Sequence, residues 1–159
     1  MSKNKIKTLT YNALLAAIYA TLTITLHPIS YGVISFRVSE ILVLLAFYQK
    51  KYIIGLIIGC LISNLASPLG LPDIIFGTFS SAIVCYLLSK SKNIWFSPIY
   101  AAIPTGLIIG FMLWSVLKLP LIESIIYVSL GEALIVFIGV LIFKGAMKYE
   151  GFKNLVFMK

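Results

Sequence analysis

Apolar runs alternate with short polar connections along the whole chain. Six apolar segments cover residues 9–26, 37–48, 52–65, 73–88, 98–116 and 123–143. A helix that crosses a bilayer needs about 20 residues, and about 17 is the usual lower limit. The second and third segments are short, so either they take in flanking residues, the second from near Val33, or they are irregular helices packed against longer neighbours. Because irregular backbone at membrane depth is tolerated where it is buried in protein or lines a cavity, we expect a site in these two segments.

The composition is that of an integral membrane protein. Of the 159 residues, 60% are hydrophobic and 11% are charged, and the mean hydropathy is +1.04, whereas soluble domains carry about 25% charged residues. We predict an all-α integral membrane fold of six transmembrane helices in one domain, residues 1–159. The net charge of +8 does not indicate a nucleic-acid partner, because the lysines are dispersed and no basic stripe is interleaved with aromatic residues.

The basic residues predict the orientation. They gather before the first segment and after the second, fourth and sixth, as Lys3, Lys5, Lys7, Lys50, Lys51, Lys90, Lys92, Lys144, Lys148, Lys153 and Lys159. The alternate connections hold Arg37, at a helix start, and Lys118. Since cytoplasmic loops are enriched in lysine and arginine, we expect both termini in the cytoplasm and the protein in the cell membrane.

The stretch from Phe36 to Glu40 places two opposite charges three residues apart within this apolar sequence. A charge at bilayer depth costs about 2.5–3.5 kcal/mol on insertion scales, so such residues usually face a protein interior or a wet cavity. If the stretch is helical, Arg37 and Glu40 share a face and partly neutralise each other. Two interpretations stay open: a structural ion pair that pins two helices, and a functional site.

Further polar residues fall on the same, outer side of the predicted membrane. They are His27, Ser30, Tyr31, Ser35, Asn64, Ser67, Asp73 and Glu123. This distribution predicts an outward-facing polar pocket. Asp73 also has a structural explanation as a helix cap, worth about 1 kcal/mol. Glu132, an acid inside the last segment, is a functional candidate by its position, and the alternative is a buried protonated acid that shares a hydrogen bond.

Small residues recur at four-residue spacing. In the first segment they are Ala13, Ala16, Ala17 and Ala20. This spacing lets another helix approach closely in lipid, so it suits either docking of a partner or packing against the protein's own helices. For the pairs Gly55/Gly59 and Gly106/Gly110 we predict internal helix contacts.

The sequence lacks the signatures of soluble enzymes. It has no P-loop, no HExxH motif, no paired-cysteine metal site and no Gly-x-Ser-x-Gly elbow. Cys60 and Cys85 lie singly in apolar segments and are expected to be buried free thiols. We therefore expect no catalysis, no metal and no cofactor.

Five stretches are specific in combination: residues 28–32, 36–40, 59–65, 69–77 and the pair Gly131-Glu132. In these stretches, which extend over nearly the whole chain, the protein resembles the QueT family, substrate-binding S components of energy-coupling-factor transporters assigned to queuosine precursors. The resemblance implies a six-helix S component that captures a scarce solute from outside. It also implies docking, through the alanine face of the first segment, on a membrane coupling subunit with two cytoplasmic ATPases.

The resemblance further implies a 7-deazaguanine as the solute. Such a ring has N–H donors along one edge and a carbonyl beside them, so it suits carboxylates, an amide or guanidinium, and a stacking aromatic ring. The candidate binding residues are Arg37, Glu40, Asn64, Asp73, Glu132 and Tyr31. An aminomethyl substituent would pair with a second acid, and a cyano substituent would leave that acid without a cationic partner. We expect Glu40→Ala or Asp73→Ala to abolish tight binding and to leave the protein folded.

Two other functions stay open at this stage. One is a stand-alone transporter driven by protons or sodium, with Glu132 or Glu40 as the coupling acid. Such folds usually carry internal repeats, and no repeated halves are visible here. The other is a membrane enzyme or assembly factor without a transport role, which would explain the outer polar cluster poorly.

Overall fold

The computed structural model describes residues 3–30 and 37–157, and every regular element in these residues is helical. In chain order the elements are α1 (Lys3–Thr25), α2 (His27–Ser30), η1 (Val38–Val43), α3 (Leu44–Tyr48), η2 (Lys50–Tyr52), α4 (Ile53–Leu65), η3 (Asp73–Gly77), α5 (Thr78–Lys90), η4 (Ile94–Phe96), α6 (Ser97–Leu117), α7 (Leu121–Ala146) and α8 (Glu150–Val156). The all-α prediction is confirmed for this part of the chain.

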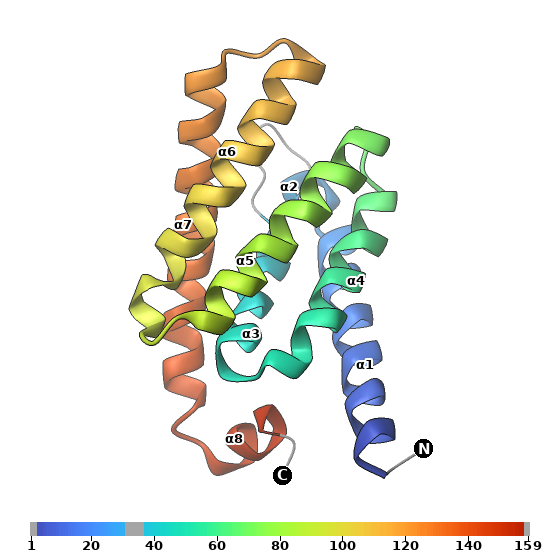
Figure 1. Ribbon diagram of the computed structural model, residues 1–159, viewed down its shortest axis with the longest axis vertical. Coiled ribbons are helices and arrows are strands. Elements are labelled where there is room, and N and C mark those ends of the chain that lie inside the picture. Colours follow the sequence, from blue (N-terminus) through green and yellow to red (C-terminus); the bar gives the residue numbers. More distant parts are fainter. Residues whose placement is uncertain (1–2, 31–36, 158–159) are drawn as a thin grey trace.

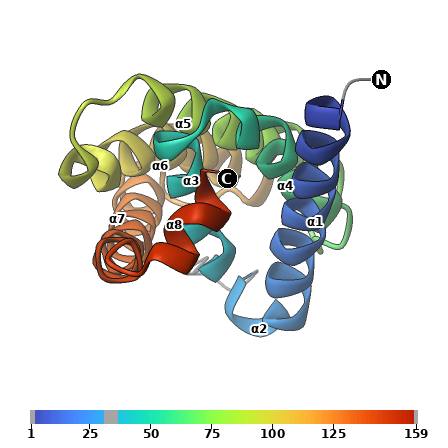
Figure 2. The same ribbon diagram turned by 90° about the horizontal axis from the view of Figure 1, so that it is seen from below.

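Two helix pairs build the molecule. The helices α6 and α7 form one pair, α1 and α4 form the other, and α5 contacts both α4 and α6 (Figure 1). The short helix α3 lies among the longer helices, and α8 lies at the end of the molecule where α1 begins (Figure 1, Figure 2). The connection between α3 and α4 lies at the same end as the start of α1, whereas the α4–α5 and α6–α7 connections lie at the opposite end.

Each of the six predicted apolar segments is helical. Within the described residues, however, four helices are long and apolar enough to cross a membrane: α1, η3 continued by α5, η4 continued by α6, and α7. The stretch Val38–Tyr48 is a shorter apolar helix, and α4 has 13 residues. The prediction of an α-helical membrane protein therefore holds in this coarser form, and the six spans and cytoplasmic termini stay predictions.

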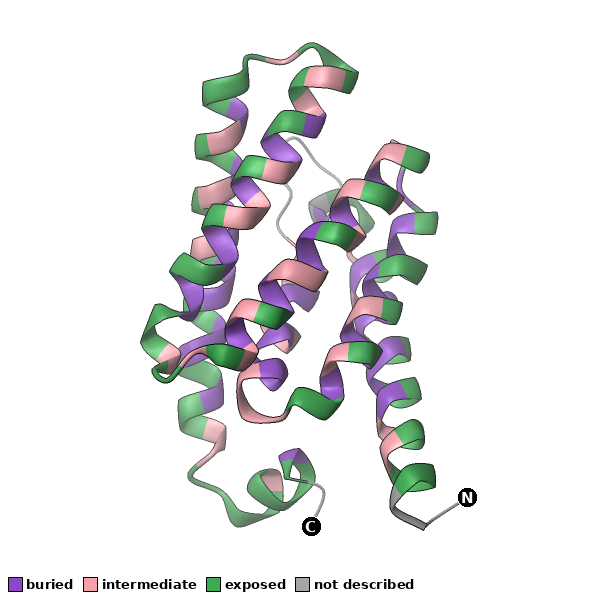
Figure 3. Cartoon of the chain, viewed as in Figure 1, coloured by how far each residue is buried: buried purple, intermediate pink, exposed green. Residues whose placement is uncertain are grey.

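Exposed residues run along the outside of the long helices (Figure 3), and many of them are large and apolar. On α6 and α7, for example, Ile103, Leu107 and Leu130 are 55%, 54% and 63% exposed. A helix that is apolar all round belongs in the core of a large protein or in lipid. For a chain of this size, the apolar exterior favours lipid.

Glycines let the helices of both pairs approach closely. A Cβ at Gly59 of α4 would stand 2.8 Å from Cβ of Tyr19 in α1, and a Cβ at Gly110 of α6 would stand 2.6 Å from Cγ1 of Ile125 in α7. Larger residues there would push the backbones apart. The predicted internal role of both glycine pairs is confirmed.

Asn12 of α1 fixes how α1 lies along α4. Its Oδ1 accepts a hydrogen bond from the backbone N–H of Gly55 at 2.8 Å, and its Nδ2 donates to the backbone carbonyl of Lys51 at 2.9 Å. The first turn of a helix has N–H groups without a partner in the helix, and α4 has no side-chain cap of its own. Asn12 therefore caps α4 from the neighbouring helix and holds the two helices in one register.

Candidate functional site

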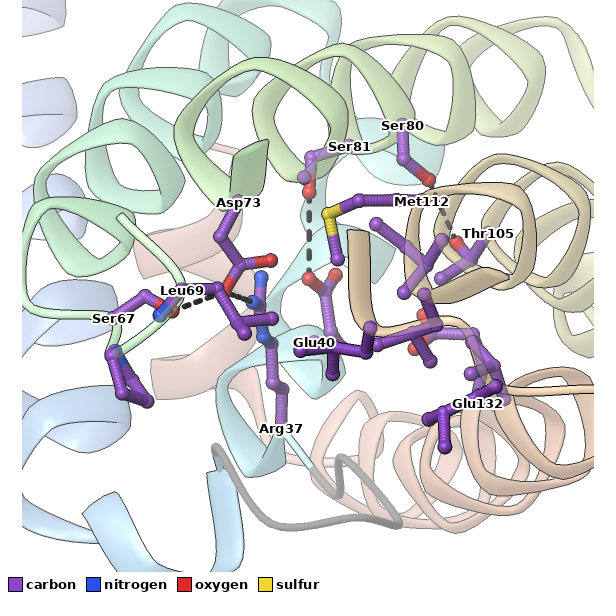
Figure 4. Close-up of a pocket in the computed structure, with 17 residues that line it drawn as sticks. Arg37, Glu40, Ser67, Leu69, Asp73, Ser80, Ser81, Thr105, Met112 and Glu132 are labelled. Atoms are coloured by element: carbon purple, nitrogen blue, oxygen red, sulfur yellow. Dashed lines mark hydrogen bonds and ion pairs between the residues drawn. The ribbon is translucent and has the colours of Figure 1, made fainter. Parts of the chain in front are cut away.

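A cavity of about 170 Å³ lies among η1, η3, α5, α6 and α7 (Figure 4). Its lining residues are Arg37, Glu40, Ser67, Pro68, Leu69, Asp73, Gly77, Ser80, Ser81, Thr105, Ile109, Met112, Leu113, Leu117, Leu119, Val128 and Glu132. Since Pro68 and Leu69 belong to the α4–α5 connection and Leu119 to the α6–α7 connection, the cavity lies toward the end of the molecule opposite the start of α1.

Arg37 and Asp73 form a buried ion pair in the cavity wall. Nη2 of Arg37 donates to Oδ2 of Asp73 at 3.0 Å, and the two side chains are 12% and 5% exposed. The same carboxylate oxygen accepts from Oγ of Ser67 at 2.5 Å. The backbone N–H of Leu69 donates to that hydroxyl at 3.2 Å. The cluster therefore ties the residue before η1 to the α4–α5 connection and to η3.

This pairing differs from the sequence-based expectation in two respects. Arg37 precedes η1 in extended backbone, with φ −83° and ψ 93°, so it does not share a helical face with Glu40 and pairs with Asp73 instead. Asp73, in turn, is not at the cap position of η3, which Pro72 occupies, and its Oδ2 accepts from Arg37 and Ser67. Its side chain serves the ion pair, and the cap explanation does not apply.

Glu40 of η1 is held on one of its two carboxylate oxygens. Oε1 accepts from Oη of Tyr19 at 2.5 Å and from Oγ of Ser81 at 3.4 Å. Glu40 is 6% exposed and Tyr19 is completely buried. Both of these hydrogen bonds fall on Oε1, and neither involves Oε2.

Two irregular helices present the acids Glu40 and Asp73 to the cavity. The first, η1, is a 3₁₀ helix of six residues, longer than the three to four residues usual for this geometry. Thr23 of α1 and Ser39 share a hydrogen bond of 2.6 Å, which holds η1 against α1. The second, η3, is a π-helical segment of five residues, a geometry frequent at functional sites. The second predicted segment is thus an irregular helix that lines a cavity.

Glu132 reaches the cavity from α7. It is 6% exposed, and its Oε1 has no hydrogen-bond partner among the described residues. In the view of Figure 4, Glu40 lies between Arg37 and Glu132. A buried polar atom without a partner costs free energy, so a donor on a solute would stabilise this arrangement. Across residues 3–30 and 37–157, no three His, Cys, Asp or Glu side chains are grouped closely enough to hold a metal ion.

Comparison with known proteins assigns the chain to a family. The model of the QueT transporter family matches residues 9–148. The chain belongs to the QueT transporter family. It is 47% identical over 85 residues to a protein of Lactococcus lactis subsp. cremoris (strain MG1363) described as "Queuosine precursor transporter QueT". The match covers 52% of this chain and 50% of that protein, so the chain spans about half the length of this curated relative. No solved structure matches the chain.

In this QueT-family chain, four of the six predicted binding residues line one cavity: Arg37, Glu40, Asp73 and Glu132. Asn64 of α4 is completely buried but is not part of the lining. Its Nδ2 donates to Oγ1 of Thr78 and Sγ of Cys60, each at 3.4 Å, and a Cβ at Gly77 would stand 2.7 Å from it. Asn64 therefore lies behind Gly77 and supports the wall. Tyr31 lies outside the described residues.

The four alanines of α1 divide between two faces. Ala16 and Ala20 are 4% and 6% exposed, and a Cβ at Gly59 would stand 3.0 Å from the carbonyl oxygen of Ala16. Packing against α4 therefore occupies Ala16, and Ala20 is buried as well. Ala13 and Ala17 are exposed, one turn apart, so of the four they are the pair open to a partner.

Several hydroxyl groups at the site were not predicted from the sequence. Tyr19 and Ser81 hold Glu40, and Oγ of Ser80 donates to Oγ1 of Thr105 at 3.1 Å across the cavity wall. The available signal was a hydroxyl group inside an apolar segment, because buried hydroxyls almost always have partners. Which partner each would find depends on the packing of helices far apart in sequence.

Proposed function

We propose that this chain is the membrane-embedded substrate-binding subunit of an ATP-driven importer, and that its solute is a queuosine precursor of the 7-deazaguanine type. The observation that carries the proposal is the buried charged cavity of Arg37, Glu40, Asp73 and Glu132 inside an apolar helical protein of the QueT transporter family. Charged groups at membrane depth are costly and mark solute pathways. The name of the Lactococcus lactis relative supports the choice of solute.

The dimensions of the cavity suit a compact planar solute. Its volume of about 170 Å³ is smaller than the roughly 300–1,000 Å³ of pockets for drug-sized ligands. Ile109, Met112 and Val128 supply an apolar surface against which a ring can pack, and the sulfur of a methionine makes favourable contacts with aromatic rings.

Glu40 is the best placed acid to bind the N–H edge of the ring. Tyr19 and Ser81 fix its Oε1, so its Oε2 can accept from the solute in a defined orientation. Asp73 already accepts hydrogen bonds from Arg37 and Ser67. We assign the guanidinium of Arg37 as the donor to the ring carbonyl. A site that binds such an edge rejects analogues without these groups by large factors.

The solute enters from the outer side in this proposal. Lys50 and Lys51 lie in the connection at the end where α1 begins, and the cavity lies toward the other end. Because cytoplasmic connections are enriched in lysine, the end with these lysines faces the cytoplasm. Energy then comes from a coupling subunit with two ATPases, which docks on Ala13 and Ala17 of α1.

The proposal is tested by equilibrium binding to the purified full-length protein in detergent. The solutes are 7-aminomethyl- and 7-cyano-7-deazaguanine, queuine, guanine and several unrelated vitamins. We expect nanomolar binding of one deazaguanine and binding of guanine at least about a hundredfold weaker, because the site distinguishes polar groups. Failure of every deazaguanine to bind to folded protein would refute the substrate assignment.

The coupling part of the proposal is tested separately by uptake into proteoliposomes. We expect uptake when the chain is reconstituted with its coupling module and internal ATP, and none with the chain alone. Uptake by the chain alone that a proton uncoupler abolishes would instead establish a stand-alone secondary transporter.

A further inference from the structure

The charges in the cavity wall are unequal in number. Among the described lining residues Arg37 is the one basic side chain, and Glu40, Asp73 and Glu132 are acidic. Arg37 and Asp73 lie 3.0 Å apart and compensate each other. Glu40 and Glu132 are therefore the two acids for which the wall supplies no second cation.

These two acids differ in their surroundings. Glu40 receives hydrogen bonds from the neutral hydroxyls of Tyr19 and Ser81. Glu132 is more than nine-tenths buried, and no described residue bonds its Oε1. A buried carboxyl group in this situation is costly unless another molecule supplies donors or a positive charge. An ammonium group supplies both, with three N–H donors.

We propose that the solute of this cavity carries a cationic amine and that Glu132 is the residue that selects it. The inference rests on the proposed function, because it needs the ring edge to occupy Glu40 and so leaves Glu132 for the substituent. Among the 7-deazaguanines, the aminomethyl compound and queuine carry such an amine. The cyano compound has the same ring and offers Glu132 neither a donor nor a charge.

The first test compares these two compounds by calorimetric titration of the wild-type full-length protein. We expect the aminomethyl compound to bind more tightly by roughly 10- to 150-fold, the range for a hydrogen bond to a charged group. Equal affinities, or a preference for the cyano compound, would overturn the proposal. If neither these two compounds nor queuine binds to folded protein, the proposed function fails and this inference fails with it.

The second test uses matched variants. Glu132→Gln keeps the shape of the side chain and removes its charge. We therefore expect this variant to bind the aminomethyl compound more weakly and the cyano compound with unchanged affinity, so that the preference for the aminomethyl compound is lost. Glu123 is exposed on the same helix, and Glu123→Gln should retain the preference for the aminomethyl compound. Glu40→Gln should bind both compounds more weakly and leave the ratio of their two affinities unchanged.

If Glu132→Gln lowers the affinity for both compounds equally, the proposal is overturned, because Glu132 would then contact the ring that both compounds share or would support the fold. The folded state of each variant is checked by its thermal unfolding. If Glu132→Gln does not fold, the wild-type comparison still decides whether the solute carries a cationic amine. Glu132→Asp, which shortens the side chain, then takes the place of Glu132→Gln in the test of Glu132, and an unchanged preference for the aminomethyl compound would overturn the proposal.

Discussion

Single residues in the cavity wall differ in how their charge is compensated. Asp73 has a cationic partner in Arg37 and a neutral donor in Ser67, whereas Glu40 has only neutral donors among the described residues. Truncating one member of a buried ion pair leaves the other in a poorly solvating environment. Asp73 therefore contributes to the fold as well as to the site.

We expect Asp73→Ala to destabilise the protein by about 3–5 kcal/mol, because Arg37 loses its carboxylate. Ser67→Ala removes a neutral donor to the same oxygen and should cost about 1 kcal/mol. Thermal unfolding in detergent measures both. This expectation replaces the earlier one that Asp73→Ala leaves the fold intact, and an unfolding midpoint equal to that of the wild type would show that the ion pair contributes nothing to stability.

At the scale of elements, α1 serves two surfaces. Its inner face carries Tyr19 and Thr23, which hydrogen-bond Glu40 and Ser39 of η1, and its outer face carries exposed small residues. The irregular helix η1 lacks the regular hydrogen bonds of an α-helix, so these side-chain bonds from α1 hold it in position.

We expect Tyr19→Phe to weaken solute binding about tenfold, because the charge-bearing Glu40 loses a hydrogen bond worth about 1.5 kcal/mol or more. The effect comes through the position of Glu40, since Tyr19 is not part of the cavity lining. Tyr11→Phe, on the same helix, is the control. Binding titration of both variants is the measurement, and wild-type affinity in a folded Tyr19→Phe variant would contradict the positioning role.

The contact between α1 and α4 depends on glycine. We expect Gly59→Ala to destabilise the protein by about 1–3 kcal/mol, the usual cost of inserting a methyl group into a packed contact. A Cβ at Gly145 would meet nothing within 4 Å, so Gly145→Ala should be neutral or slightly stabilising. Comparison of the two unfolding midpoints checks this, and equal midpoints would mean that the two helices separate at little cost.

At the scale of the whole molecule, the cavity and the lysine-bearing α3–α4 connection lie toward opposite ends, and many exposed residues of the long helices are apolar. Such a protein can bind a solute at one face of a membrane, but the described chain offers no nucleotide-binding motif to drive release. In the proposed function, the partner that supplies energy therefore contacts the lipid-facing surface or the end of the molecule that bears the lysines.

We expect the double variant Ala13→Trp, Ala17→Trp to lose assembly with the coupling module and to retain solute binding, because bulky side chains prevent close approach of a second helix. Leu134→Trp, at a half-exposed position on α7, should affect neither. Co-purification with the coupling module and binding titration provide the two readouts. Undiminished co-purification of the double variant would exclude this face as the docking surface.

Local patterns in the sequence specify the helical segments and the residues that bear charge. Apolar runs and glycine spacing are properties of neighbouring positions, so the six segments, the internal role of both glycine pairs and four cavity residues could all be predicted. The family was also recognisable from its combined stretches, and the family match over residues 9–148 agrees. Asn64 and the alanine face were less predictable, because the side of a helix that turns inward depends on its neighbours.

The partners of the buried polar groups, by contrast, follow from the tertiary packing. Arg37 and Asp73 are 36 residues apart and Tyr19 and Glu40 are 21 apart, and no local pattern specifies such partners. Arg37 pairs with Asp73 and not, as its sequence spacing suggested, with Glu40, because its own backbone is extended. The alanines lie on two faces of α1, and α4 packs against one of them. Local periodicity governs which residues become helical, whereas the pairing of buried polar groups is chosen by the packing of whole helices that must leave few of those groups unsatisfied.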